Sequence, residues 1–156
     1  MSVLPEHPTM IAQTIQLALA PVFVLVAIGN IMNILTNRLA RMVDRSRHLQ
    51  TLHPGTEGSE HDVVVVEMRI IDQRIAHIGR ALLCLVMSGL AIGTTVAALF
   101  LSELAGTDLR LVTAATFVLA IVLLMGALVL LLLETRLASR TLRLPPELLE
   151  LERGDL

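Results

Sequence analysis

The sequence predicts an all-α membrane protein with three transmembrane helices and an antiparallel cytoplasmic helical hairpin between helices 1 and 2. Hydrophobic residues make up 54% of the 156 residues and charged residues only 17%, unlike the balance of soluble domains. The charged side chains gather in short blocks that leave three long stretches without any charge. Each stretch reaches the ~20 residues that a helix needs to cross ~30 Å of hydrocarbon. This pattern excludes a disordered chain and an ordinary soluble enzyme.

The first transmembrane helix is predicted over residues 10–36, after a periplasmic N-terminus of residues 1–9. No charged residue lies between Glu6 and Arg38, and a helix satisfies its own backbone hydrogen bonds in lipid. Residues 1–9 contain His7 but no lysine or arginine, so we expect no cleaved secretory signal. Pro21 removes one backbone hydrogen bond inside this helix, where we expect a bend.

One face of this first helix is rich in amide side chains. At 100° per residue, four of them fall within about 100° of arc: Gln16, Asn30, Asn33 and Asn37. Unpaired amides are costly in hydrocarbon, so this face should meet protein or water rather than lipid. Two interpretations stay open. The amides either form hydrogen bonds between helices, within one chain or between copies, or line a channel that several copies surround.

Residues 37–80 are predicted to form the hairpin, because their apolar residues recur at alternating steps of four and three, the spacing of a coiled coil. The outgoing series is Leu35, Leu39, Met42, Ser46 and Leu49, and the returning series is Val64, Met68, Ile71, Ile75, Ile78 and Leu82. Between them, residues 51–61 contain proline and glycines typical of a loop. The alternative is a short strand at residues 63–66, four β-branched valines.

The distribution of arginine predicts the orientation in the membrane. The chain has no lysine, and every arginine except Arg110 lies in residues 37–80 or 134–156. Basic residues near the ends of transmembrane helices favour the cytoplasmic side. We therefore expect the N-terminus in the periplasm, with the hairpin and the C-terminal tail in the cytoplasm.

Three of these arginines are candidates for contact with anionic lipid headgroups. Arg38, Arg41 and Arg45 share one face of the first hairpin helix, next to the membrane surface. The alternative is that they serve only topology and solvation, with Asp44 and Asp72 as ion-pair partners for some of them.

The second and third transmembrane helices are predicted over residues 81–101 and 111–133, joined by a periplasmic turn of residues 102–110. Each is free of charged residues, and the short turn predicts a close antiparallel pair. The second helix carries a row of small residues at four-residue spacing, which lets helix backbones approach closely: Gly89, Gly93 and Ala97.

No ionisable residue lies in the middle of a predicted span, which argues against a proton relay or a voltage sensor. The chain also lacks a phosphate-binding glycine loop and a nucleophile elbow. We therefore expect no enzymatic activity, no cofactor, no metal site and no nucleic-acid partner. One alternative for the hairpin tip is a divalent-metal site formed by histidines and acidic residues: His48, His53 and His61 with Glu57, Glu60 and Asp62.

Residues 134–156 are predicted to be a cytoplasmic tail. Pro145 and Pro146 precede leucines that alternate with acidic residues, which indicates a short amphipathic helix. This segment either docks on the arginine-rich hairpin or on a partner, or it is a frayed end.

Two segments carry a resemblance to a known family. Residues 11–49 read IAQTIQLALAPVFVLVAIGNIMNILTNRLARMVDRSRHL, and residues 66–83 read VEMRIIDQRIAHIGRALL. Together with the two closing spans, they resemble the bacterial membrane-protein family called domain of unknown function 2721, over about residues 10–143. The resemblance implies an inner-membrane protein with three spans, and it implies no substrate, cofactor or catalytic residue. Its recognisable element is the stretch Asn37 to Arg41.

These observations predict an integral protein of the bacterial inner membrane that acts as a self-assembling scaffold or as an accessory subunit of a larger membrane complex. Its expected partners are the lipid bilayer, including anionic lipids, and further copies of itself or other subunits. The alternative is a small homo-oligomeric ion channel lined by the amide face of helix 1.

Overall fold

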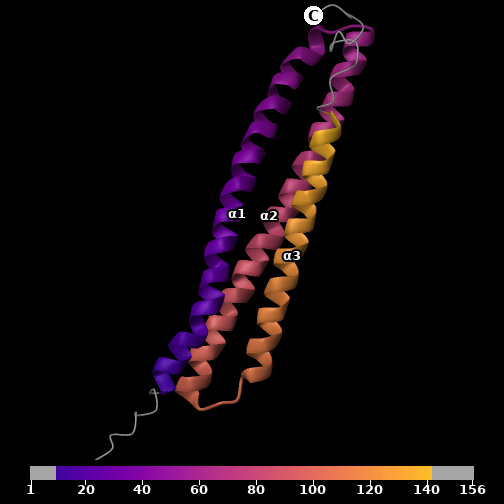
Figure 1. Cartoon of the computed structure of the whole chain (residues 1–156). Coiled ribbons are helices and arrows are strands. Elements are labelled where there is room, and N and C mark those ends of the chain that lie inside the picture. The colour runs from indigo at the N-terminus through magenta and orange to yellow at the C-terminus, as the bar shows by residue number, and fades with distance from the viewer. Residues whose placement is uncertain (1–9, 142–156) are drawn as a thin grey trace, which may run out of the picture.

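The computed structural model describes residues 10–141, with side chains described for residues 15–136. The elements follow in the order α1 (Met10–Leu52), the short 3-10 helix η1 (His53–Gly55), α2 (Ser59–Ala105) and α3 (Arg110–Thr141). Figure 1 shows three long helices side by side in an elongated bundle. The predicted N-terminus, residues 1–9, and tail residues 142–156 lie outside the described residues.

The all-helical prediction is confirmed. Within residues 10–141, three helices are long and apolar enough to cross a membrane, and no strand occurs. The alternative of a strand at residues 63–66 is wrong, because these valines lie inside α2. On a helix these valines face different sides. Val64 is buried in the core, whereas Val63 and Val66 are exposed.

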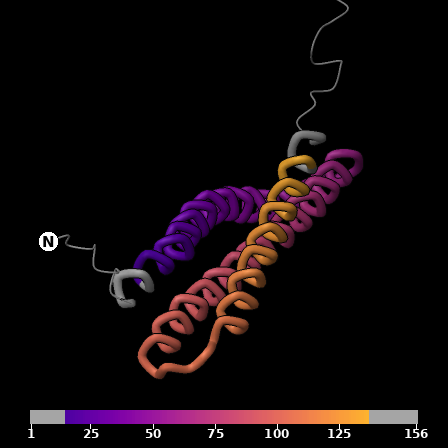
Figure 2. Tube along the Cα trace, turned by 60° about the horizontal axis from the view of Figure 1, so that its bottom comes forward, coloured from indigo at the N-terminus to yellow at the C-terminus, as the bar shows by residue number. Residues whose placement is uncertain are grey.

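Both α1 and α2 run without a break through the borders predicted between the membrane and the hairpin. α1 has 43 residues and α2 has 47, and Pro21 lies inside α1, where it is buried. Figure 2 shows α1 bowed along its length. The loop is shorter than predicted. Gly58 (φ 61°) precedes α2 and Gly106 (φ 61°) follows it, in the left-handed region that favours glycine.

The predicted seams of the hairpin are the surfaces on which α1 and α2 meet. All eleven seam residues are buried or half-buried. At the loop end, Leu49, Val64 and Ile71 form a buried cluster, and Met42, Met68 and Ile75 pack against it. At the other end, the Cδ1 methyl group of Leu25 lies 3.7 Å from the position that a Cβ atom would take at Gly89. Six of the eleven seam residues therefore belong to one cluster that α1 and α2 share.

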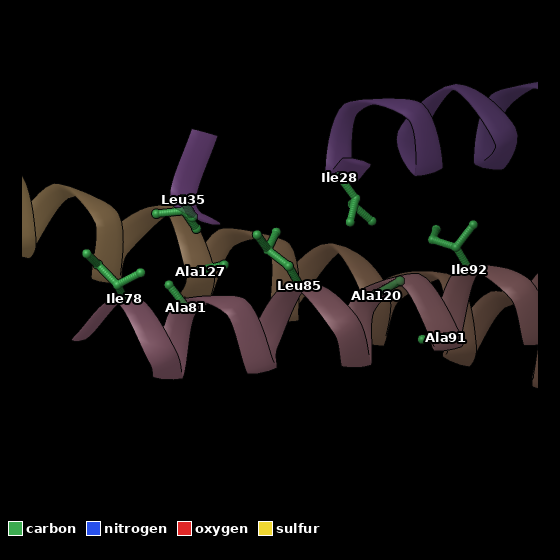
Figure 3. Packing of buried hydrophobic residues seen from close by; sticks show 9 residues of the cluster. All are labelled: Ile28, Leu35, Ile78, Ala81, Leu85, Ala91, Ile92, Ala120 and Ala127. Atoms are coloured by element: carbon green, nitrogen blue, oxygen red, sulfur yellow. The ribbon is translucent and has the colours of Figure 1, made fainter. Parts of the chain in front are cut away.

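The contact between α2 and α3 depends on small residues and hydroxyl groups. Ala81, Ala120 and Ala127 are at most 1% exposed, and they lie between the two helices with larger residues around them (Figure 3). The Ser88 Oγ donates a hydrogen bond to the carbonyl oxygen of Ala120 at 2.7 Å. Lipid tails are as apolar as leucine, so close packing and hydrogen bonds of this kind must hold the helices together.

We expect Ala120→Leu to destabilise the bundle by about 1–3 kcal/mol, because the added methylenes have no space between α2 and α3. Val122, on the same helix, is 60% exposed, so Val122→Leu serves as the matched control and should leave stability unchanged. Thermal unfolding of both variants in the same detergent measures the difference. Equal melting temperatures would contradict this packing.

Candidate functional site: an ion cluster shared by the three helices

The most unusual feature of the structure is a buried carboxylate that binds two guanidinium groups. Glu134 on α3 is 1% exposed. Its Oε2 accepts a hydrogen bond from an Nη of Arg38 on α1 at 2.5 Å. Its Oε1 accepts bonds from the Nε of Arg74 on α2 at 3.1 Å and from an Nη of the same residue at 2.8 Å. Each long helix thus contributes one member of this ion cluster.

Helical periodicity brings the three side chains together. Glu134 follows Ala127 by seven residues, so it continues the stripe of α3 that faces α2. Arg74 precedes Ala81 by seven residues and continues the matching stripe of α2. Arg38 lies one turn beyond Leu35, which is buried on α1. When the apolar faces of the three helices pack together, the three charged side chains are therefore brought into contact.

The three side chains of the cluster differ in exposure. The side chain of Arg74 is 18% exposed and that of Arg38 is 30% exposed, whereas Glu134 is covered. Arg38 also donates a hydrogen bond to the Thr135 hydroxyl at 3.2 Å. No buried side-chain nitrogen or oxygen of the described residues lacks a hydrogen-bond partner. A buried charge is tolerated when it is paired in this way, and removal of one partner is strongly destabilising.

The sequence pattern alone did not predict this cluster. It placed Glu134 at the start of the tail, one residue beyond the third predicted span, whereas α3 continues to Thr141. Among the described residues, the carboxylates that pair with Arg38 and Arg45 are Glu134 and Glu67, rather than the proposed Asp44 and Asp72. The available signal was the seven-residue spacing from Ala120 through Ala127 to Glu134.

The three arginines predicted to contact lipid have different surroundings. Arg38 belongs to the ion cluster. Arg45 binds both carboxylate oxygens of Glu67 on α2, at 2.8 and 3.0 Å, in a pair whose side chains are 48% and 37% exposed. Arg41 is exposed. Contact of these arginines with lipid headgroups stays a prediction.

The amide face of α1 points away from α2 and α3. Its four residues are exposed, and among the described residues none of them makes a hydrogen bond to another helix. The Nδ2 of Asn37 donates to the Oδ1 of Asn33 at 3.4 Å on the same helix. The Thr36 hydroxyl lies 3.0 Å from the carbonyl oxygens of Met32 and Asn33. Gln16 and Asn30 are exposed on the same face of α1.

The row of small residues on α2 is split between two surroundings. Gly89 is half-buried against α1, whereas Gly93 and Ala97 are exposed and no atom lies within 4 Å of the Cβ position of Gly93. A role of this row in helix packing therefore stays a prediction. For Gly93 and Ala97, the predicted contacts would be with another chain. Within the chain, Ala81, Ala120 and Ala127 occupy the close contacts.

The hairpin tip brings two histidines together. The rings of His53 and His61 lie 4.5 Å apart and are tilted by 60°, and the Thr56 hydroxyl lies 3.3 Å from Nδ1 of His61. In the described part of the chain, no three histidine, cysteine or acidic residues are placed to hold a metal ion. His48 is exposed and belongs to no such group.

Comparison with known families adds one finding. A family model described as a protein of unknown function (DUF2721) matches residues 18–144. The matched range contains the three members of the ion cluster and all of the amide face except Gln16. Neither the curated proteins nor the solved structures include a match to this chain.

We expect Glu134→Gln to lower the free energy of unfolding by about 3 kcal/mol, because it leaves two partly buried guanidiniums without a counter-charge. Glu67→Gln is the matched control, since it breaks an exposed pair and should cost less than about 1 kcal/mol. Thermal or denaturant unfolding in one detergent compares the two. If both variants lost a similar free energy of unfolding, burial would not make the Glu134 ion pairs stronger than the Glu67 ion pair.

Proposed function

The chain belongs to the DUF2721 family of proteins of unknown function, and from that premise we propose a self-assembling scaffold or accessory subunit of a bacterial inner-membrane complex. The exposed amide face of α1 is the observation that carries this proposal. The chain contributes three apolar helices consistent with a multi-pass membrane protein, and the proposal includes no catalytic step and no cofactor.

Unpaired polar groups in an apolar solvent favour self-assembly. Asn30 and Asn33 lie within the first predicted span and are exposed on the single chain. Each primary amide has both donors and acceptors, so the same face of a second copy complements it. Interhelical hydrogen bonds of this kind contribute about 0.6–2 kcal/mol each in membranes. Several amides on one face therefore favour association of copies.

The proposed topology has the hairpin in the cytoplasm. Contacts run in opposite order along α1 and α2: Leu49 clusters with Val64 at the loop, and Leu25 packs against Gly89 far from it. This order supports an antiparallel, coiled-coil hairpin. The excess of arginine on the hairpin side supports its cytoplasmic placement and a role of Arg41 in contact with anionic lipids.

A second candidate function is a small homo-oligomeric ion channel. The spacing of the amide face supports it as well, because copies of α1 that surround a water-filled pathway would present the same residues to it. The two functions differ in what the amides contact: other side chains in the scaffold, and water in the channel.

We expect the protein to form oligomers in nanodiscs. The substitutions Asn30→Leu and Asn33→Leu should weaken the association of the copies. Loss of one interhelical bond should raise the dissociation constant roughly 3- to 30-fold. Thr36→Val is the matched control, because the Thr36 hydroxyl bonds to its own helix. Mass measurement of the particles reports the oligomer. A monomer under all conditions would exclude both the scaffold formed by self-assembly and the channel.

Ion flux into reconstituted vesicles separates the two candidates. The scaffold predicts no flux above that of empty vesicles, with the oligomer intact. A conductance that the Asn30→Leu and Asn33→Leu variants reduce, while Thr36→Val retains it, would instead establish the channel.

Reporter fusions test the topology. A reporter placed after Leu49 and one placed after Arg143 should both give a cytoplasmic signal. Both sites lie in the arginine-rich segments, and such segments favour the cytoplasmic side. A periplasmic signal at either site would overturn the proposed orientation.

A further inference from the structure

An apolar groove lies on α1 and α2, and on α2 it runs from Asp62 to Arg74. It has a volume of about 550 Å³ and is lined by Met42 and Arg45 from α1 and by Val63, Val66 and Ile70 from α2. The side chain of Val63 is 66% exposed and that of Val66 is 55% exposed. In a hairpin outside the membrane these valines would face water, so a covering segment would remove apolar surface from solvent.

The groove continues the face of α2 on which α3 packs. Ser88, Ala81 and Arg74 follow one another at seven-residue steps along this side of α2, and each is buried or half-buried. The next step of seven reaches Glu67, with Val63 and Ile70 one turn to either side of it. The surface that receives α3 thus extends beyond the last described contact between the two helices.

The register of α2 and α3 gives the position at which α3 ends. Ser88 bonds to Ala120 and Arg74 bonds to Glu134, which is a separation of fourteen residues on both helices. α3 continues seven residues from Glu134 to Thr141, so its end lies level with Glu67. The remaining fifteen residues, 142–156, therefore start beside the groove.

The sequence of residues 142–156 has the composition of a segment that fits an apolar groove. Leu144, Leu148 and Leu151 follow at steps of four and three, which places them on one side of a helix. Pro145 disfavours helical backbone at the residue before it, so a helix cannot pass straight through this point. The acidic residues of the segment would face Arg45 at the groove, but Asp62 and Glu67 line it too, so apolar contact carries the argument.

We propose that residues 142–156 fold back onto this groove, with leucine side chains against Val63, Val66 and Ile70. From Thr141, the six residues up to Glu147 span at most about 20 Å, enough to reach any of these three side chains. In this arrangement the C-terminal segment is a third element of the hairpin. It links the end of α3 to α2 beyond the ion cluster.

Cysteine cross-linking in the full chain tests the proposal. In a Cys84→Ala background, Val66→Cys with Leu148→Cys should form a disulfide within one chain upon mild oxidation. Asp72→Cys with Leu148→Cys is the matched control, because Asp72 is exposed on a different side of α2. Equal cross-linking in both pairs, or a disulfide that joins two chains, would overturn the proposal.

A second measurement does not depend on disulfide geometry. The thiol of Val66→Cys, in the Cys84→Ala background, should react with a water-soluble maleimide about tenfold faster when Leu148→Asn and Leu151→Asn are added, because the segment no longer gains from burial of two leucines. The rate at Asp72→Cys should not change. Equal rates at Val66→Cys with and without the asparagines would show that the segment does not cover the groove.

Discussion

A carboxylate shared by two guanidinium groups holds α1, α2 and α3 in one register. Between helices in lipid the hydrophobic effect contributes little, so small residues and polar contacts must determine how the helices align. A slip of α3 by one turn moves Glu134 by about 5.4 Å, away from both Arg38 and Arg74. The bonds of 2.5 and 2.8 Å could not survive that shift, and the buried charge would lose its partners. The alignment of Ala81 with Ala127 and of Ser88 with Ala120 agrees with the same register.

The polar side chains of the chain divide into two groups. Toward the interior, hydroxyls and charges find partners: Ser88 bonds to a backbone carbonyl of α3, Thr95 lies 2.9 Å from the Thr116 hydroxyl, and Glu134 binds both arginines. Toward the exterior, the amides of α1 have no partner on another helix of the described chain. Every buried side-chain nitrogen or oxygen of the described residues thus has a hydrogen-bond partner, whereas the amide face is exposed. For this reason the proposed function concerns the association of copies.

Much of the fold followed from two patterns in the sequence. Long charge-free stretches predicted three apolar helices, and the structure has three such helices. Alternating steps of four and three predicted the surfaces on which α1 and α2 meet, because both helices turn with nearly the same period along their contact. The helix borders were harder to predict. Charge blocks mark where a chain can leave lipid, but α1 and α2 continue past these points because nothing in the backbone breaks them.

The sequence by itself determined the helical class and the apolar spans, since these depend on local periodicity and on hydropathy. Only the tertiary structure decided which charges are buried. In a linear count, Glu134 is one more acidic residue at the end of a span, and Arg38 is one more basic residue at a membrane border. Their meeting with Arg74 depends on residues 60 to 96 positions apart in the chain. It also depends on the relative rotation and axial shift of three helices, which no local pattern encodes.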